Sequence, residues 1–305
     1  MSDIYDVIII GGGPAGLTAG IYCARGRFKT LMLEKLISGG QVMTAFMIEN
    51  YPGFPEGIQG PELMEKFIEQ GKRFGLETDS GTVEKITVEE DIKLIHLEDR
   101  TIKCKAVIIA SGAAPIKLNI PGEGLYVGRG VSYCATCDGA FFRNQEVAVI
   151  GGGNSALSEA FFLTRFASRV HIIHRRDKLR ADAIVQEEAH ANPKITFILD
   201  TVVDSVEGDD SGMTRLKVRN IKSGATSELP AQGVFIYVGM HPNTEFLKGF
   251  VELTPDGYIV ADEEGRTSIP GIFAAGDVRK KELRQIATAV GDGASVSFTV
   301  EKYLK

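Results

Sequence analysis

The chain lacks the features that mark several large classes of protein. Among its 305 residues there is no uninterrupted apolar run long enough to cross a bilayer. Its 34 Lys and Arg are outnumbered by 40 Asp and Glu, and the net charge of −6 argues weakly against nucleic acid as a partner. An apolar segment begins at Tyr5, so a basic start with a cleavage site is missing and no secretory signal is predicted. We therefore expect a cytoplasmic protein with neither a membrane nor a nucleic acid as partner.

The composition is that of an ordinary globular protein. Hydrophobic residues make up 44% and charged residues 24% of the chain, which is long enough to bury a large core. The length alone predicts about two domains.

Cysteine is scarce, and its placement is informative. Cys23 and Cys104 stand alone, whereas Cys134 and Cys137 are separated by two residues and followed by Asp138. Half of a zinc site is one interpretation, but zinc needs a second Cys or His pair at ligand spacing, and the sequence has none. Two thiols at this spacing can close a reversible disulfide, and the adjacent carboxyl can move the proton that thiol chemistry needs. In a cytoplasmic protein the pair is therefore predicted to be redox-active, and no metal site is predicted.

One pattern of strand, glycine loop, helix and strand occurs twice. The strands before the loops are 7–10 and 147–150, and the strands after the helices are 30–34 and 170–173. The loop positions are Gly11, Gly13 and Gly16 in the first copy and Gly151, Gly153 and Ala156 in the second. A single G-x-G-x-x-G is a weak signal, but the strand-to-helix context that the dinucleotide fingerprint requires is present twice. The sequence predicts an α/β protein with two Rossmann-like, dinucleotide-binding domains.

Each glycine of such a loop has a physical purpose. The first permits a tight turn, the second lets the backbone approach a pyrophosphate, and the third position must be small so that the helix packs closely on the strand. The pyrophosphate then lies at the positive end of the helix. A tight turn without a ligand is the alternative, and it is weakened because both copies would have to be such turns.

The two copies differ where the fingerprint reads the ribose. Glu34 can accept hydrogen bonds from an unmodified ribose diol, as expected for the adenosine half of a flavin dinucleotide. The same distance from the second loop leads to a basic cluster formed by His174, Arg175, Arg176 and Arg180. Guanidinium groups pair with a 2′-phosphate, which a carboxylate would repel. The second copy is therefore predicted to prefer NADPH over NADH, although a solvated basic turn would look the same in sequence.

In this order the motifs resemble the low-molecular-weight, bacterial and archaeal type of NADPH-dependent thioredoxin reductase. The matching segments are Cys-Ala-Thr-Cys-Asp-Gly at 134–139, Gly-Gly-Gly-Asn-Ser-Ala at 151–156, the basic cluster and Gly-Asp at 276–277. Further segments at 40–41, 49–54 and 284–287 look like the flavin contacts of that family. The resemblance covers essentially the whole chain, and a Cys-x-x-Cys inside the NADPH domain is particular to this subgroup.

The resemblance implies a domain arrangement and a set of cofactor contacts. An FAD-binding domain of residues 1–113 and 244–305 would be interrupted by an NADPH-binding domain of residues 114–243, and the protein would be a homodimer. The flavin contacts added to the first glycine loop and Glu34 are Gly40, Gln41, Asn50, Asp277, Gln285, Ile286 and Ala287. The NADPH contacts added to the second loop and the basic cluster are Asn154 and Ser155. Many members of the family carry Asp at the position of Asn154, and we expect this difference to have a mild effect.

The resemblance also implies an electron route, which runs from NADPH to FAD, then to a Cys134–Cys137 disulfide, and then to a disulfide of thioredoxin or a thioredoxin-like protein. In the family Cys137 faces the flavin, Cys134 attacks the partner, and Asp138 is the general acid. A thiol oxidase on the same scaffold would pass electrons from a dithiol to oxygen and would need no basic cluster. Peroxiredoxin reductases of this type usually carry an extra N-terminal segment that the sequence does not show. A non-catalytic flavin-binding module, with the cysteine pair incidental, is the remaining alternative.

Overall fold

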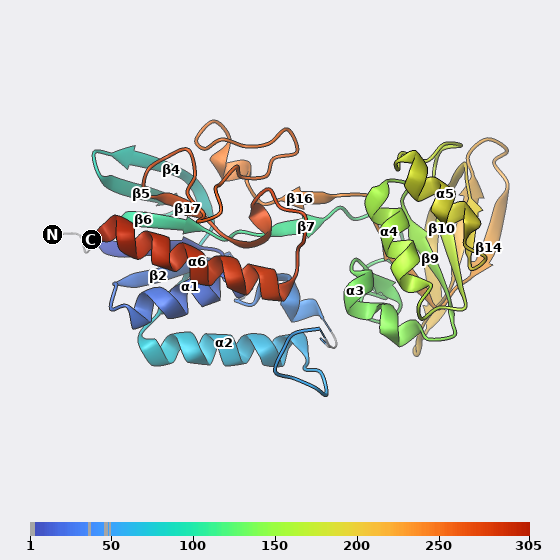
Figure 1. Ribbon diagram of the computed structural model, residues 1–305, viewed down its shortest axis with the longest axis horizontal. Helices are drawn as coiled ribbons and strands as arrows, with labels where there is room; N and C mark the ends of the chain where they lie inside the picture. The colour runs from blue at the N-terminus through green and yellow to red at the C-terminus, as the bar shows by residue number, and fades with distance from the viewer. Residues whose placement is uncertain (1–3, 36–37, 46–47, 49) are drawn as a thin grey trace. The chain divides into compact units, whose positions relative to one another are not determined.

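The computed structural model describes residues 4–35, 38–45, 48 and 50–305 of the chain. By their contacts the residues form two compact units, unit 1 made of Met1–Ala114 and His241–Lys305 and unit 2 made of Pro115–Met240 (Figure 1). The chain passes between the units twice, at the short strands β7 (Ala113–Pro115) and β16 (Met240–Pro242). These two strands pair with each other as a small separate sheet.

Unit 1 is built on a sheet with the strand order β3-β2-β1-β6-β5-β4, and β17 also pairs with β6. The strands are β1 (Tyr5–Ile10), β2 (Thr30–Glu34), β3 (Glu77–Ser80), β4 (Val83–Glu89), β5 (Ile92–Leu97), β6 (Thr101–Ile109) and β17 (Ile272–Ala274). β1 is parallel to β2 and β6, whereas β5 is antiparallel to β4 and β6. The last four residues of β1 are apolar and buried, as expected for a parallel strand that is covered on both faces.

Helices cover one face of this sheet. They are α1 (Pro14–Arg25), α2 (Gly60–Phe74) and α6 (Ile286–Leu304), and α1 and α6 lie side by side (Figure 1). Proline suits the first position of α1, and Gly75 ends α2 in the left-handed conformation that glycine adopts without strain. The helices share a core with Val7 and Ile9 of β1, and Ile8 and Ile10 belong to the core on the opposite face. Short 3-10 helices occupy Gly40–Thr44 (η1), Glu245–Leu247 (η3) and Gly276–Val278 (η4).

Unit 2 contains a parallel sheet with the order β11-β10-β9-β15-β8 and an antiparallel sheet with the order β12-β13-β14. The parallel strands are β8 (Val131–Ser132), β9 (Glu146–Ile150), β10 (Arg169–Ile173), β11 (Ile195–Ile198) and β15 (Gly233–Ile236). The antiparallel strands are β12 (Thr201–Asp209), β13 (Gly212–Asn220) and β14 (Thr226–Pro230). The helices are α3 (Ala135–Asp138), η2 (Gly139–Phe142), α4 (Asn154–Leu163) and α5 (Ala183–Ala191).

The same local topology occurs in both units. In unit 1 the strand before the glycine loop, β1, lies between β2 and β6, and in unit 2 the corresponding strand, β9, lies between β10 and β15. All four pairings are parallel, so each glycine loop leaves the carboxyl edge of its sheet, where ligands bind in open α/β folds. The predicted α/β class with two Rossmann-like sheets is confirmed.

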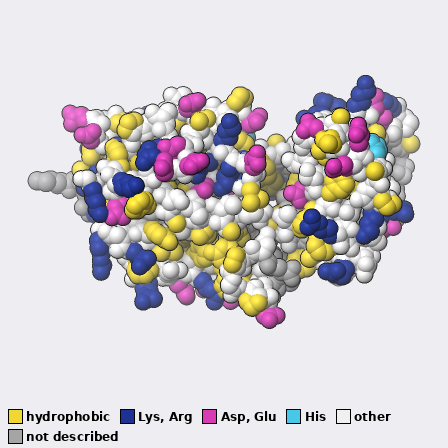
Figure 2. All heavy atoms as spheres, in the orientation of Figure 1, with side chains coloured by type: hydrophobic (Ala, Val, Ile, Leu, Met, Phe, Trp, Pro, Cys, Tyr) yellow, Lys and Arg dark blue, Asp and Glu magenta, His cyan; other side chains and the backbone are white. Residues whose placement is uncertain are grey.

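The surface of the molecule carries charges of both signs. On the visible face of each unit, Lys and Arg side chains are interspersed with those of Asp and Glu (Figure 2). In the described part of the chain, no helix has the length and apolar character needed to span a membrane.

Candidate redox centre and nucleotide sites

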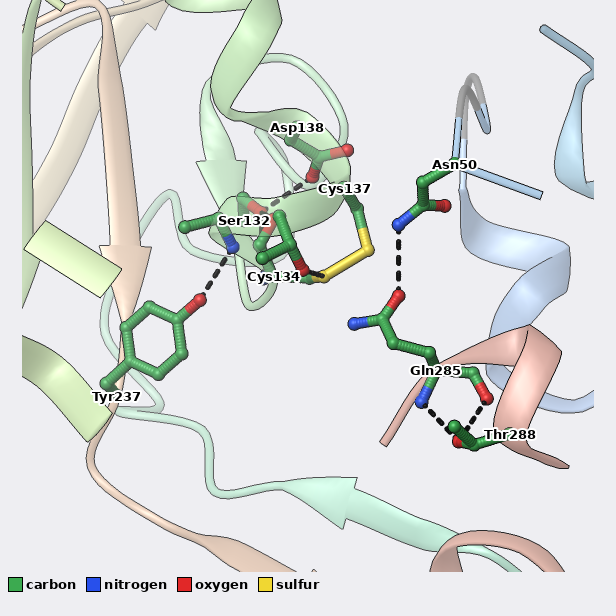
Figure 3. Close-up of a disulfide and its surroundings, with 10 residues drawn as sticks. Asn50, Ser132, Cys134, Cys137, Asp138, Tyr237, Gln285 and Thr288 are labelled. Atoms are coloured by element: carbon green, nitrogen blue, oxygen red, sulfur yellow. Dashed lines mark hydrogen bonds between the residues drawn. A yellow bond between two sulfur atoms is a disulfide. The ribbon is translucent and has the colours of Figure 1, made fainter. Parts of the chain in front are cut away.

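Cys134 and Cys137 are joined by a disulfide at the start of α3 (Figure 3). Cys134 is the N-cap residue of this short helix, and its carbonyl oxygen accepts the N–H groups of Cys137 and Asp138 at 3.3 and 3.1 Å. The helical turn therefore brings the two sulfur atoms together. Cys23 and Cys104 are buried and unlinked, and burial raises the pKa of each thiol to about 12, so both stay protonated and unreactive.

Asp138 is held against the disulfide segment by the hydroxyl of Ser132, the last residue of β8. Ser132 Oγ donates a hydrogen bond to Asp138 Oδ2 at 2.6 Å, and the same oxygen accepts the N–H of Cys134 at 3.1 Å (Figure 3). Burial raises the pKa of the Asp138 carboxyl, and the bond from Ser132 opposes part of that rise. A carboxyl with a raised pKa next to two sulfur atoms is suited to hold and release a proton.

Tyr237 makes a second contact with the start of α3. Its phenol oxygen accepts the N–H of Ala135 at 2.6 Å, from a position directly after β15 (Figure 3). Burial raises the pKa of Tyr237, and the carboxylate of Glu159 adds to this, so the phenol stays neutral. The backbone N–H groups of Cys134 and Ala135 are thus both bonded to side-chain hydroxyls of neighbouring parallel strands.

The first glycine loop combines a close backbone contact at Gly16 with open space at Gly13. A Cβ atom on Gly16 would come within 1.9 Å of the carbonyl oxygen of Gly11, so close packing of helix and loop requires glycine there. Gly13 differs, because its φ of −77° suits any residue and a Cβ atom would meet nothing within 4 Å. The missing side chain of Gly13 leaves open space at the helix start. Glu34 Oε2 accepts the N–H of Gly12 at 2.7 Å, which holds the carboxylate against the loop.

Asp277 lies in the 3-10 helix η4, which is separated from β17 by the single residue Ala275. The N–H of Gly276 donates to Asp292 Oδ2 at 2.9 Å and fixes this turn to α6. Asp277 Oδ1 is buried and has no hydrogen-bond partner among the described residues. Burial raises the pKa of Asp277, and the charges of Lys281 and Arg284 oppose the rise. A buried carboxylate oxygen without a donor is costly, so this atom fits a ligand that carries hydroxyl groups.

Further predicted flavin contacts are placed by hydrogen bonds within unit 1. Gln41 Nε2 donates to the carbonyl oxygen of Ala113, and Asn50 Nδ2 donates to Gln285 Oε1 at 3.0 Å (Figure 3). Gln285 is the N-cap residue of α6 and forms a capping box with Thr288. The other predicted contacts are Gly40 at the start of η1 and Ile286 and Ala287 at the start of α6. Glu49, which precedes Asn50, lies outside the described residues.

The second glycine loop repeats the open space of the first. Gly153 has a φ of −98°, and a Cβ atom on it would meet nothing within 4 Å. A Cβ atom on Gly151 would lie 2.6 Å from the carbonyl oxygen of Tyr237, and one on Gly152 would lie 2.4 Å from His174 Nδ1. Ser155 is exposed in the first turn of α4. The loop therefore packs tightly against its neighbours at Gly151 and Gly152 and has open space at Gly153.

The basic cluster adjoins this loop. Arg175, Arg176 and Arg180 are exposed, and the N–H of Arg180 donates to the carbonyl oxygen of Gly152 at 2.6 Å. His174 is only 5% exposed, and its Nε2 has no partner in the part of the chain that the structure describes. Burial and the charge of Arg180 lower the pKa of His174, which keeps the ring neutral at pH 7. The three arginine side chains are thus exposed, and the backbone of Arg180 contacts the glycine loop.

Comparisons with known proteins identify relatives of this chain. The family described as pyridine nucleotide-disulphide oxidoreductase matches residues 5–293. The sequence is 47% identical to a thioredoxin reductase of Listeria innocua over 302 residues, which is 99% of this chain and 94% of that protein. It is 45% identical to a thioredoxin reductase of Bacillus subtilis over 302 residues, 99% of this chain and 95% of that one.

The chain belongs to the thioredoxin reductase family.

A solved structure of the thioredoxin reductase family gives the same result for the fold. The crystal structure of thioredoxin reductase from Streptococcus pyogenes superposes with a TM-score of 0.96 and 48% sequence identity, covering 100% of this chain and 99% of that chain. The resemblance predicted from the sequence is confirmed, and with it the assignment as an oxidoreductase with the redox-active disulfide Cys134–Cys137. Among the described residues no group of His, Cys, Asp and Glu could hold a metal ion.

Two residues next to the disulfide of this thioredoxin reductase family member were not predicted from the sequence. Ser132 is the last residue of β8 and Tyr237 follows β15, and their hydroxyls accept the backbone N–H groups of Cys134 and Ala135. The carboxyl ends of β8 and β15 lie at the same edge as the end of β9, because the three strands are parallel. A polar residue at the end of a short apolar segment is the signal that could have indicated them.

Proposed function

We propose that this chain reduces the disulfide of thioredoxin or a thioredoxin-like protein, with NADPH as electron donor and FAD as electron carrier. The observation that carries the proposal is the Cys134–Cys137 disulfide, with the buried carboxyl of Asp138 beside it, in a chain that contains two glycine loops with open space for a pyrophosphate. Family membership supports the same conclusion, since the relatives are thioredoxin reductases.

The residues of unit 1 fit FAD. The open space at Gly13 would take the pyrophosphate, Glu34 would accept the adenosine ribose hydroxyls, and the unpartnered Oδ1 of Asp277 would accept a hydroxyl of the ribityl chain. Asn50 and Gln285 are bonded to each other and would hold one edge of the ring site in place. When bound, FAD supplies two-electron transfer between a hydride donor and a disulfide.

The residues of unit 2 fit NADPH. Gly153 leaves space for the pyrophosphate at the start of α4, and the three exposed guanidinium groups of the basic cluster would pair with the 2′-phosphate. His174 is neutral and buried behind them, so its unpartnered Nε2 can meet a polar group of the nucleotide without adding charge. NADH has no group to match the guanidinium charges, and a preference for NADPH follows.

The exchange step follows from thiol chemistry at α3. In the reduced dithiol, the Cys134 thiolate would attack one sulfur of the partner disulfide, forming a mixed disulfide and releasing the other partner sulfur as a thiolate. Asp138 would donate its proton to that leaving thiolate. The Cys137 thiol would then pass its proton to the Asp138 carboxylate and attack Cys134 Sγ of the mixed disulfide, which closes the Cys134–Cys137 disulfide again. The second partner sulfur would take up that proton as it leaves, so the partner is released as a dithiol. Ser132 would hold the Asp138 carboxyl in place throughout.

An anaerobic titration tests the whole route. NADPH should bleach the flavin absorbance of the purified protein at lower concentration than NADH, and added oxidised thioredoxin should then restore it. Cys134→Ser should keep the bleaching and lose thioredoxin reduction, whereas Cys23→Ala, which changes a buried cysteine far from the disulfide in sequence, should keep both. A flavin that stays oxidised in excess NADPH would refute the proposal. Electron flow from a dithiol to oxygen without any NADPH response would favour the thiol oxidase instead.

Two further parts of the proposal concern the context in which the chain works. We expect a homodimer, as the resemblance to the family implies, and sedimentation equilibrium tests it. We also expect a cytoplasmic location, because a reduced dithiol pair is maintained in a reducing compartment.

A further inference from the structure

The two segments that would hold NADPH are fastened to each other by several hydrogen bonds. The carbonyl oxygen of Gly152 accepts the N–H groups of Arg180 and Ala181 at 2.6 and 3.1 Å. Close to these bonds, Asn154 Nδ2 donates to Asp182 Oδ2 at 3.0 Å, and the N–H of Asp182 donates to Asn154 Oδ1 at 2.8 Å. The end of the basic cluster is thus joined to the glycine loop through backbone and side chains.

The pair of Asn154 and Asp182 joins the starts of two helices. Asn154 is the first residue of α4, and Asp182 is the N-cap residue of α5. An aspartate at an N-cap usually accepts a backbone N–H of its own helix. The Asp182 side chain makes no such bond, and its carboxylate accepts the amide of Asn154 instead. The side chain therefore connects the two segments rather than stabilising the start of α5.

The chemistry of the pair explains why an amide stands at position 154. An ionised carboxylate can only accept hydrogen bonds, whereas an amide offers both a donor and an acceptor. Asn154 uses both, one toward the Asp182 carboxylate and one toward the Asp182 N–H. An aspartate at 154 would place two carboxylates at hydrogen-bond distance, and their repulsion would separate the two segments.

The basic cluster is also held at its other end. The N–H of His174 donates to the carbonyl oxygen of Ile198 at 3.0 Å, and Lys222 forms ion pairs with Asp177 and Asp200 at 3.2 and 3.0 Å. The start and middle of the segment are therefore tied to β11 and the turn that follows it. The bonds to the glycine loop then decide where the last arginine, Arg180, lies.

We propose that Asn154 and Asp182 are positioning residues that fix the distance between the pyrophosphate end and the 2′-phosphate end of the nucleotide site, and so determine the discrimination of NADPH from NADH. The proposal rests on the proposed use of NADPH. With the pair intact, the arginines are ordered before the nucleotide arrives. With the pair broken, the arginines become ordered only when the nucleotide binds. The conformational entropy that they lose then makes the binding free energy less favourable. Only ligands with a 2′-phosphate are affected, because only they contact the basic cluster.

Binding of redox-inactive nucleotides to the oxidised FAD holoenzyme tests this directly. The probes are 2′,5′-ADP, which carries the 2′-phosphate, and 5′-ADP, which does not, both measured by calorimetry. N154D should lower the ratio of the affinity for 2′,5′-ADP to the affinity for 5′-ADP about tenfold, consistent with the usual coupling between contacting residues. D182N still offers an oxygen to the Asn154 amide and should stay within about twofold of the native protein. The swapped double variant N154D/D182N should recover the native affinity, because the amide at position 182 then donates to the carboxylate at position 154.

A long-range charge effect predicts another pattern. N154D adds a negative charge and D182N removes one. If only these charges mattered, D182N would tighten the binding of 2′,5′-ADP as much as N154D weakens it. In the double variant the two effects would simply add. That result would overturn the proposal. The structural readout is amide hydrogen exchange of Arg180 and Ala181 without nucleotide, which should accelerate in N154D and return to the native rate in the double variant.

The remaining outcomes separate this proposal from the proposed function. Equal affinity of the native protein for 2′,5′-ADP and 5′-ADP would refute the NADPH preference and, with it, the role of the pair in discrimination. Discrimination in the native protein that N154D leaves unchanged would refute the role of the pair alone.

Discussion

Replacing Ser132 by alanine should raise the proton affinity of Asp138. The Ser132 hydroxyl donates to Asp138 Oδ2 at 2.6 Å, and this bond opposes the effect of burial on the pKa of the carboxyl. It does so because a hydrogen bond to an ionised carboxylate is stronger than one to the neutral acid. Ser132→Ala removes that bond without adding volume, and it also leaves the Cys134 N–H without its hydroxyl partner.

The magnitude follows from the contribution of one hydrogen bond to a charged group, about 1.5–3 kcal/mol. Since about 1.4 kcal/mol corresponds to a factor of ten, the proton-binding constant of Asp138 should rise about tenfold to a hundredfold. The same shift predicts how the free energy of unfolding depends on pH. Because burial raises the pKa of Asp138 in the folded protein, its ionisation opposes folding, and this cost is absent below the ordinary carboxyl pKa and appears as the pH rises. The free energy of unfolding of S132A should therefore fall further below that of the native protein as the pH rises.

Carboxyl titration by infrared difference spectroscopy, on the oxidised protein, measures this shift. Asp138→Asn identifies the signal by removing it, and Ser132→Thr, which keeps a hydroxyl, should titrate close to the native protein. A midpoint for S132A that equals or lies below the native one would refute the reasoning, because it would mean that the hydroxyl does not stabilise the carboxylate. A loss of stability that is the same at every pH would point to the Cys134 contact instead.

Three other predictions concern the cofactor loops and the second hydroxyl at α3. Gly13→Ala should fold normally but hold FAD at least about tenfold more weakly, whereas Gly16→Ala should fail to form the loop at all; flavin content per chain and thermal unfolding distinguish the two. Asp277→Asn should weaken FAD retention about tenfold or more, as measured by flavin release on ultrafiltration, and unchanged retention would show that its buried oxygen has no ligand. Tyr237→Phe leaves a buried N–H unpaired, at a cost of about 1–3 kcal/mol, so hydrogen exchange at Ala135 should accelerate while the aromatic packing persists.

The parts of the site that are local in sequence could be predicted, and the parts that depend on strand register could not. The Cys134–Cys137 pair and the two glycine loops each lie within a short segment, and the residue types of such a segment are enough to predict its local geometry. The fold class could be predicted because the strand, glycine loop and helix pattern occurs twice. Ser132 and Tyr237 are 105 positions apart in the numbering, and only the pairing of β15 with β8 and β9 brings both to α3. Nothing in either segment alone shows that both hydroxyls contact the start of α3.

The role of Asn154 shows the same limit. From the sequence, Asn154 was a nucleotide contact whose difference from Asp looked mild. The structure places it opposite Asp182, 28 positions later, and the role that we propose for this pair depends on that contact. The glycines show the opposite case. The dinucleotide fingerprint predicts that a ligand approaches the backbone at Gly13 and Gly153, and in the structure a Cβ atom on either residue would meet nothing within 4 Å. Gly16 must be glycine for a different reason, because a Cβ atom there would clash with the backbone of the loop.

Because β7 and β16 run side by side, the polypeptide leaves and re-enters its first unit at almost the same point. Ile116 N–H donates to the carbonyl oxygen of Gly239 at 3.0 Å, so the two ends of unit 2 are already neighbours. On the other side Asn243 Nδ2 donates to the carbonyl oxygen of Ser111 at 2.7 Å. The gene could therefore be divided at these two strands. One product would be unit 2 as a continuous domain with the disulfide and its hydroxyl partners, and the other would be unit 1 with its two segments joined by a short linker. Such adjacent ends are what allow one domain to be inserted into another without disturbing the host.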